Sequence, residues 1–355
     1  MSRFFSNKYD KLIPYTPGEQ PQNMKYVKLN TNESPFPPSA KAKAYAANHL
    51  RELNLYSDPN CVELRSKLAE LYEVEPDELV LTNGSDDILN FALMAFCDEE
   101  HPAAFADISY SFYPVLADLN NVESIIVPLK EDFTIDVDGF CNIGATVFIP
   151  NPNAPTGVLL ELADVERIVS TNPNNVVVID EAYIDFGGKS AVQLIHKYPN
   201  LLVSQTFSKS RSMAGARLGM GFGSKELIAD INTLRYSTNP YNVNSMTAAM
   251  GLGLLEDEET TRANCEIIIE NREYTQKALE GMGFQVLPST ANFIFARSDR
   301  MNGGDIYDKL KAKGVLVRHF GAERISDWNR ISIGTREQMD ILIDTLEEIF
   351  KEAEV

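Results

Sequence analysis

The chain has 355 residues, of which 44% are hydrophobic and 23% are charged, a composition typical of globular and not of disordered proteins. This length favours one large domain with a smaller companion. The net charge of −19 argues against general affinity for nucleic acid or an anionic membrane, so an anionic ligand requires a local basic pocket.

Signals for targeting and for metal binding are lacking. No apolar run approaches the roughly 20 residues that span a bilayer, and residues 1–11 lack the apolar core and cleavage site of a secretory signal. The four cysteines form no CxxC pair, which favours free thiols in a reducing cytoplasm, and the four histidines show no metal-ligand spacing. We therefore expect a cytoplasmic protein without a metal site and without nucleic-acid or membrane partners.

The first 40 residues predict an extended arm, because prolines at this density prevent regular helix. The arm contains the segments Pro14-Tyr-Thr-Pro-Gly-Glu-Gln-Pro21 and Leu29-Asn-Thr-Asn-Glu-Ser-Pro35. A disordered leader would have the same composition. The apolar residues Tyr15, Val27 and Leu29 favour instead an arm that lies on a folded surface.

From about residue 60 the pattern alternates between helix and strand. Apolar residues at helical spacing predict helices over 62–72 and 86–96. Short apolar runs predict strands over 78–82, 103–106, 124–127, 145–149, 176–179 and 201–203. Continuous apolar strands separated by helical stretches indicate a mostly parallel sheet covered on both faces.

The C-terminal part has a different texture. Helices are predicted at about 241–255, over 257–281 and over 336–352, and strands over 293–296, 315–318 and 330–333. We expect an arm (1–40) that completes the smaller unit, a large domain (41–255) and a small α+β domain (256–355).

Two turns follow strands of the predicted large sheet. Thr82-Asn-Gly-Ser-Asp-Asp87 joins a strand to a helix, where a glycine turn and free amides make an anion site. The alternative is an ordinary helix cap. Asn151-Pro-Asn-Ala-Pro-Thr-Gly157 lies where open α/β sheets bind ligands, although a plain loop fits as well.

Two charged side chains end other strands. Asp180 follows an apolar strand, and a buried carboxylate is costly unless a positive group meets it. Its alternative is a helix cap. Lys209, in Thr206-Phe-Ser-Lys-Ser-Arg211, precedes Arg217 in a glycine-containing segment, where the arginine can bind phosphate. The alternative is that the Ser-Lys pair lies on the solvent-exposed surface and has no specific role.

The ordered set Asn-Pro-x-x-Pro-Thr-Gly, Asp-Glu-Ala-Tyr, Ser-Lys and Gly-x-Arg-x-Gly resembles the fold-type I pyridoxal-phosphate aminotransferases. The two arm segments, Asp180-Glu-Ala-Tyr-Ile-Asp-Phe186 and Arg330-Ile-Ser-Ile-Gly-Thr-Arg-Glu337 resemble more narrowly the histidinol-phosphate aminotransferase family. The likeness covers essentially the whole chain. It implies a seven-stranded, mostly parallel sheet in an α/β/α sandwich, a smaller α+β domain, and pyridoxal phosphate as the cofactor.

The resemblance assigns roles around the cofactor. Lys209 would bind it as a Schiff base and then shuttle a proton, and Asp180 would pair with the pyridinium nitrogen. Tyr183 would hydrogen-bond the 3′-oxygen, and Tyr110 would stack on the ring. The phosphate would be held by the remaining members of this set: Ser208, Arg217, Gly84, Ser85 and Asp86.

The resemblance also implies a homodimer and a substrate site. Tyr56, in Leu55-Tyr-Ser-Asp58, would reach the cofactor phosphate of the neighbouring subunit; for Tyr56 and Tyr110 ordinary packing is the alternative. The acidic group of the substrate would meet Arg330, helped by Arg318, Tyr15 and Tyr241. Arginine suits both a phosphate ester and the carboxylate of glutamate. A salt bridge at the rim is the alternative for Arg318.

One position departs from the pattern. The residue before Pro155-Thr-Gly157 is commonly Asn in this superfamily, where it contacts the 3′-oxygen, and here it is Ala154. Either a neighbouring asparagine substitutes for it, for which we expect Asn153, or Tyr183 works without that partner. The segment Asp107-Ile-Ser-Tyr110 also lacks the proline often found before this aromatic residue.

The implied reaction converts L-histidinol phosphate and 2-oxoglutarate to imidazole-acetol phosphate and glutamate in a ping-pong cycle. An aromatic or broad-specificity aminotransferase and a threonine-phosphate decarboxylase are the alternatives on the same fold. A non-catalytic ligand sensor is the alternative from another class, but such sensors usually carry a DNA-binding domain, for which this chain has neither room nor charge.

Overall fold

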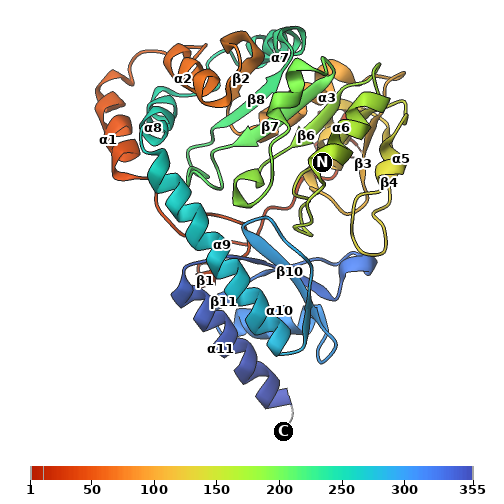
Figure 1. The fold of residues 1–355 in the computed structure, drawn as a ribbon, viewed down its shortest axis with the longest axis vertical. Coiled ribbons are helices and arrows are strands. Elements are labelled where there is room, and N and C mark those ends of the chain that lie inside the picture. The colour runs from red at the N-terminus through yellow and green to blue at the C-terminus, as the bar shows by residue number, and fades with distance from the viewer. Residues whose placement is uncertain (1, 11, 354–355) are drawn as a thin grey trace.

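The computed structural model describes residues 2–10 and 12–353; Met1, Lys11 and residues 354–355 lie outside it, and with them the outermost residues of the predicted arm and small domain. Figure 1 shows a larger part built on a central sheet and a smaller part built on a second sheet. Helix α9 (Glu258–Gly281) runs from one part to the other. The domain boundaries at residues 40 and 255 stay predictions.

Seven strands form the central sheet in the order β2-β8-β7-β6-β5-β3-β4. Strand β8 is antiparallel to both of its neighbours, and the other pairs are parallel. The expected mostly parallel sheet is therefore confirmed. Its strands are β2 (Leu79–Thr82), β3 (Ala103–Ala106), β4 (Ser124–Val127), β5 (Thr146–Pro150), β6 (Val177–Asp180), β7 (Leu201–Thr206) and β8 (Gly219–Gly223).

Helices cover both faces of this sheet, because successive strand residues point to opposite sides. Val147 and Ile149 pack into one core, and Phe148 between them packs into the other. This confirms the α/β/α sandwich. The first core takes side chains from α1 (Ala40–Asn48), α2 (Val62–Tyr72), α5 (Val137–Phe140), α6 (Leu162–Thr171) and α8 (Ser245–Leu255), and the second from α3 (Ser85–Phe96), α4 (Phe112–Asn120) and α7 (Lys225–Thr238).

The sequence pattern did not predict strand β8, whose sequence is Gly-Met-Gly-Phe-Gly. Glycine is depleted in strands because it loses more backbone entropy on folding than other residues and has no side chain to pack. The tertiary structure explains the glycine at its start, since a Cβ on Gly219 would lie 2.3 Å from the carbonyl carbon of Gly84. Strand β8 therefore passes directly against the turn that follows β2.

The smaller sheet is antiparallel and has the order β12-β13-β10-β9. The prediction of a single strand over 315–318 is wrong, because two short strands lie there. The first, β11, pairs in parallel with β1 (Val27–Lys28) of the arm, and the second pairs with β13. The other elements are β9 (Phe284–Val286), β10 (Phe293–Ser298), α10 (Gly303–Ala312), β11 (Val315–Leu316), β12 (Arg318–His319), β13 (Trp328–Ser332) and α11 (Arg336–Ala353).

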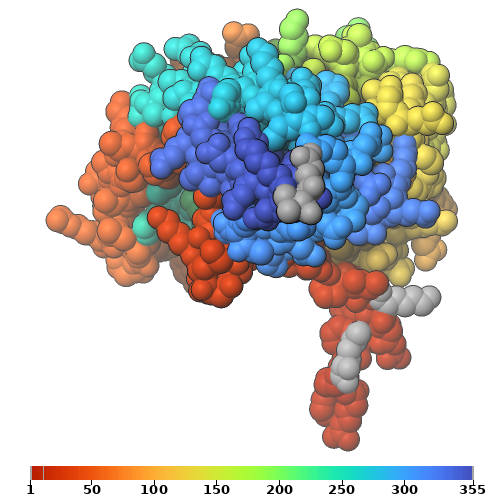
Figure 2. All heavy atoms as spheres, turned by 90° about the horizontal axis from the view of Figure 1, so that it is seen from below, coloured from red at the N-terminus to blue at the C-terminus, as the bar shows by residue number. Residues whose placement is uncertain are grey.

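The arm follows the folded surface over most of its length, as its apolar residues predicted. Leu29 is buried in the core of the smaller sheet, together with residues of α9 and α11. Only the N-terminal end of the arm projects from the body of the molecule (Figure 2). No helix within residues 2–10 and 12–353 is both long enough and apolar enough to cross a membrane.

Candidate active site

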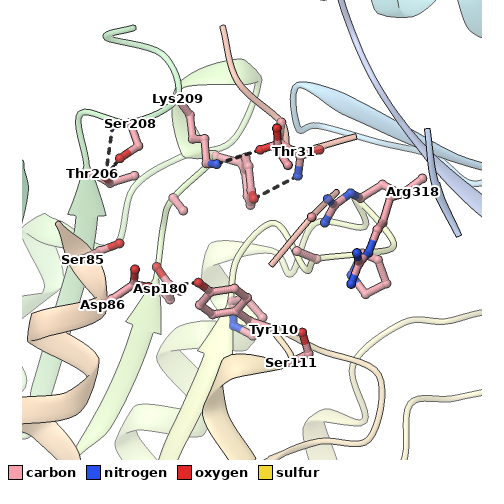
Figure 3. Close-up of a pocket in the computed structure, with 18 of the residues that line it drawn as sticks. Thr31, Ser85, Asp86, Tyr110, Ser111, Asp180, Thr206, Ser208, Lys209 and Arg318 are labelled. Carbon is pink, nitrogen blue, oxygen red and sulfur yellow. Dashed lines mark hydrogen bonds between the residues drawn. The ribbon is translucent and has the colours of Figure 1, made fainter. Parts of the chain in front are cut away.

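The carboxyl ends of β2, β3, β5, β6 and β7 meet at one edge of the large sheet, where open α/β sheets bind ligands. A cavity of about 190 Å³ lies there, bounded by this edge, the arm and the smaller sheet (Figure 3). Most of the predicted site residues line it: Tyr15, Ser85, Asp86, Tyr110, Asp180, Tyr183, Ser208, Lys209, Arg217, Arg318 and Arg330.

Four predicted site residues do not line the cavity. Gly84 lies against the guanidinium group of Arg217. Asn153 is buried, and its side-chain amide donates to the backbone carbonyl of Ile108. Tyr56 is 83% exposed and stacks on Tyr241, with 4.4 Å between the ring centroids. Neither tyrosine contributes to the cavity of the single chain.

Asp180 ends strand β6 and is only 4% exposed. Its Oδ2 atom accepts a hydrogen bond from the Tyr113 hydroxyl at 3.2 Å, whereas Oδ1 has no partner among the described residues. Burial raises the pKa of Asp180 to about 7, and the charge of Asp86 acts in the same direction. A buried carboxylate oxygen without a partner is costly, so the site suits a cationic N–H group in the cavity.

Lys209 follows strand β7 and brings an amine to the same cavity. Its Nζ donates to the backbone carbonyl of Thr31 in the arm at 3.3 Å (Figure 3). The same Nζ lies 5.7 Å from the centre of the Tyr183 ring. An amine beside a phenol and a buried carboxylate can add to a carbonyl carbon and move protons at a ligand.

A third group of residues forms a site for an anion. Helix α3 begins at Ser85, and its N-cap Gly84 has no side chain that could accept from the free amides of the first turn. Arg217 is in the left-handed region, with φ 58°, and its Nη2 donates to Asp86 Oδ2 at 2.9 Å. Ser208 lies near Ser85 and Asp86 at this end of the cavity (Figure 3).

Two arginines enter the cavity from the smaller sheet. Strands β12 and β13 place Arg318 directly opposite Arg330, so both guanidinium groups lie on one face. Burial lowers the pKa of Arg330, and the positive charge of Arg318 lowers it further. Two like charges held together in a partly buried place favour an anionic ligand between them.

Known proteins are similar in sequence to this chain over most of its length. Residues 24–346 match the family model described as aminotransferase class I and II. The chain belongs to this family. It is 45% identical over 350 residues to the histidinol-phosphate aminotransferase of Clostridium botulinum, covering 98% of this chain and 99% of the relative. It is 44% identical over 353 residues to that of Brachyspira hyodysenteriae, covering 99% and 100%.

The fold is also that of solved aminotransferases. The histidinol-phosphate aminotransferase of Sinorhizobium meliloti, in complex with pyridoxal-5′-phosphate, superposes with a TM-score of 0.85 at 22% identity, covering 93% of this chain and 92% of that one. The predicted fold-type I architecture is therefore confirmed. The described residues of this aminotransferase include no group of three or more His, Cys, Asp or Glu side chains that could hold a metal ion.

Two residues of the aminotransferase site were not predicted from the sequence. Tyr113 holds one oxygen of Asp180, and Asn32 lines the cavity and contacts Tyr183. Asn32 lies in the segment Leu29–Pro35 that the sequence pattern singled out, and Tyr113 lies three residues after the predicted site residue Tyr110. Their positions carried a signal, but only the tertiary structure relates each one to its partner.

Proposed function

We propose that this aminotransferase transfers an amino group between L-histidinol phosphate and 2-oxoglutarate with pyridoxal phosphate as its cofactor, giving imidazole-acetol phosphate and glutamate. Histidinol-phosphate aminotransferases that are 44–47% identical over nearly the whole chain support this reaction in histidine biosynthesis. The observation that carries the proposal is that Arg318 and Arg330 line the same cavity as Lys209. One bound ligand could therefore contact both the anion site and the amine.

The residues of the cavity fit pyridoxal phosphate. The unpartnered Oδ1 atom of Asp180 suits a protonated ring nitrogen, and the amine of Lys209 suits the aldehyde carbon. Tyr183 lines the same cavity, and its hydroxyl would hold the 3′-oxygen. Tyr110 would stack on the ring, and the phosphate would be bound by Arg217, Ser208 and the amides of Gly84, Ser85 and Asp86.

Bound pyridoxal phosphate supplies an electron sink for the pair left when the substrate carbon loses its proton. Asp180 would keep the ring nitrogen protonated, because the positive charge would stabilise its buried carboxylate. Lys209 would take the proton from the substrate carbon at Nζ and deliver it to C4′ of the cofactor. The arm and the smaller sheet cover part of the cavity and so limit access of water to these transfers.

The substrate end explains how a protein of net charge −19 binds a phosphorylated substrate. Arg318 and Arg330 concentrate positive charge locally, and their partial burial limits screening by solvent. A guanidinium group meets either a phosphate or a carboxylate with two hydrogen bonds. The same pair of arginines can therefore accept histidinol phosphate and glutamate in turn.

Replacing Gly84 with alanine is expected to lower thermal stability and weaken cofactor binding. Gly84 has φ 87° and ψ 162°, a conformation that costs other residues about 1–3 kcal/mol. A Cβ there would also lie 2.5 Å from Arg217 Nη2, so Arg217 must move. We expect a melting temperature lower by a few degrees and roughly tenfold weaker binding of pyridoxal phosphate.

Thermal denaturation and an absorbance titration with the cofactor measure these two effects. Gly281→Ala is the matched control, because a Cβ at that position meets no atom within 4 Å. Equal losses in both variants would contradict the role of Gly84 at the anion site.

Replacing Arg330 with alanine is expected to lower kcat/KM for histidinol phosphate about 10²-fold or more, because truncation of one partner of a buried charge pair costs 2–5 kcal/mol. Arg330→Lys keeps the charge and loses the planar fork, so we expect an intermediate loss. L-Histidinol, which lacks the phosphate and carries no other anionic group, serves as the comparison substrate in steady-state assays. A uniform loss for both substrates would contradict phosphate recognition by Arg330.

Turnover of histidinol phosphate, phenylalanine and threonine phosphate, measured side by side, tests the function itself. Preference for histidinol phosphate supports the proposal. Preference for phenylalanine indicates an aromatic aminotransferase, and release of carbon dioxide from threonine phosphate indicates a decarboxylase. Failure to transfer an amino group from histidinol phosphate would overturn the proposed function.

We further propose a cytoplasmic homodimer in which Tyr56 reaches the cofactor phosphate of the partner subunit. In support, Tyr56 and Tyr241 form an exposed aromatic stack that does not line the cavity of its own chain. Leu50, Leu53 and Leu55 are exposed beside Tyr56 in the sequence, and such apolar surface favours a protein contact. The four free cysteines agree with a reducing compartment. Light scattering of the purified protein tests the dimer.

A further inference from the structure

The position before Pro155 presents no polar group to the cavity. Ala154 lines the cavity and is buried against Ala291, Phe293 and Tyr183. Its methyl group cannot donate a hydrogen bond to a cofactor oxygen. If an amide acts at the 3′-oxygen in this chain, it has to come from another residue.

Asn153 is not free to supply this amide. Its Nδ2 donates to the Ile108 carbonyl at 3.1 Å and to Thr156 Oγ1 at 2.9 Å, and the side chain is buried. It does not line the cavity. Turning Asn153 toward the cavity would break both bonds and leave buried groups unsatisfied, which is costly.

Asn32 in the arm has the required position. It lines the cavity, is only 1% exposed, and its Nδ2 donates to the Tyr183 hydroxyl at 3.1 Å. Its Oδ1 accepts from Ser332 Oγ at 2.9 Å, and the same Oγ accepts from the Asn32 backbone N–H at 2.8 Å. Asn292 Nδ2 donates to the Asn32 carbonyl at 2.9 Å. These bonds fix which end of the amide faces Tyr183.

The neighbours of Asn32 make parallel contacts. The carbonyl of Asn30 accepts from Arg330 Nη2 at 2.9 Å, and the carbonyl of Thr31 accepts from Lys209 Nζ at 3.3 Å. Three successive arm residues thus each contact one residue with a proposed role in the reaction. The backbone of Asn32 is left-handed, with φ 55°, a conformation that asparagine tolerates better than most residues and that recurs at functional sites.

We propose that Asn32 is a positioning residue that replaces the amide missing at Ala154: it holds the Tyr183 hydroxyl in place and strengthens its hydrogen bond to the 3′-oxygen of pyridoxal phosphate. A hydroxyl that accepts a hydrogen bond becomes a better donor, because bonds in a chain polarise one another. Ser332 ends strand β13 of the smaller sheet, and Asn292 directly precedes strand β10. Asn32 therefore has this support only while the arm packs against the smaller sheet. The inference rests on the proposed cofactor and not on the choice of substrate.

The test is a pH titration of the visible absorbance of the cofactor-bound protein without substrate. A hydrogen bond to the 3′-oxygen stabilises its negative charge and thereby lowers the pKa of the proton that it shares with Lys209 Nζ. Asn32→Ala should therefore raise the titration midpoint by about 0.5–1 pH unit, the size expected for one neutral hydrogen bond. The double variant Asn32→Ala/Ala154→Asn should return the midpoint toward the wild-type value.

Two further variants separate positioning from general damage. Ser332→Ala leaves Asn32 in place but frees its side chain, so the midpoint should rise in the same direction by a smaller amount. Asn153→Ala should lower thermal stability without moving the midpoint. These two variants keep the test decisive if Asn32→Ala fails to fold.

An unchanged midpoint in Asn32→Ala or Ser332→Ala, or a rise in Asn153→Ala alone, would overturn the proposal. Turnover of histidinol phosphate is measured separately on the wild-type protein. A shifted midpoint in a protein that does not use histidinol phosphate would refute the proposed substrate and leave the role of Asn32 supported.

Discussion

Replacing Lys209 with alanine is expected to lower turnover of histidinol phosphate by at least about 10³-fold, because one side chain provides both the covalent attachment of the cofactor and the proton transfer. No other lysine lines the cavity within the described part of the chain, so no neighbour can take its place. The visible absorbance of the bound cofactor should also be lost. Steady-state rates and absorbance spectra with added pyridoxal phosphate measure the two effects.

Lys197→Ala is the matched control for the lysine. Lys197 is exposed and forms an ion pair with Glu166, remote from the cavity lining. Its loss should change neither turnover nor absorbance. A wild-type protein that stays colourless with pyridoxal phosphate supplied would refute the cofactor and favour the non-catalytic sensor. Retained turnover in Lys209→Ala would refute the role of this lysine alone.

Replacing Asp180 with asparagine is expected to lower turnover by about 10²- to 10⁴-fold. The carboxylate would hold the proton on the ring nitrogen, and loss of one partner from a buried ion pair costs 3–5 kcal/mol. The uncharged amide fills the same space and can still accept from the Tyr113 hydroxyl. We expect weaker binding of pyridoxal phosphate as well, measured by an absorbance titration.

The same substitution is expected to stabilise the cofactor-free protein at neutral and alkaline pH. Burial raises the pKa of Asp180 to about 7, above its usual value of 3.8, so the folded state binds a proton that the unfolded state releases. This contribution is complete below about pH 4 and is lost as the pH rises through about 7. Above that pH, Asp180→Asn avoids an unpaired buried charge and should gain about 1–3 kcal/mol.

Urea denaturation of the cofactor-free protein at about pH 5 and about pH 8 checks the sign. The gain from Asp180→Asn should be larger at the higher pH. Asp138→Asn is the control, because Asp138 is exposed on the surface and pairs with Arg167. A gain that is equal at the two pH values would contradict an ionised, unpaired Asp180.

Local sequence pattern was sufficient for much of the fold. The central strands β3, β5, β6 and β7 are buried on both faces, which makes them continuous apolar runs that are easily recognised. Strand β8 was missed for the opposite reason. Its glycines serve close backbone approach to the turn after β2, and a local pattern records no such contact.

That the residues proposed to bind the cofactor lie together was also largely predictable. Asp180 and Lys209 each follow a strand of a parallel sheet, and the carboxyl ends of such strands meet at one edge whatever the details of packing. Residues of this kind can be placed from topology alone. The smaller sheet behaves differently, because Arg318 and Arg330 become neighbours only through the register of β12 and β13.

The sequence by itself determined the fold class and the family, and it singled out Lys209 as the proposed nucleophile, since these depend on residue types in a fixed order along the chain. Only the tertiary structure decided which amide supports Tyr183. The sequence offered Asn153, one residue from Ala154, but the buried bonds of Asn153 hold it away from the cavity. Asn32 reaches Tyr183 across 151 positions of sequence because the arm pairs with β11 and is held by Ser332. A contact made by chain folding over such a distance leaves no local pattern to read.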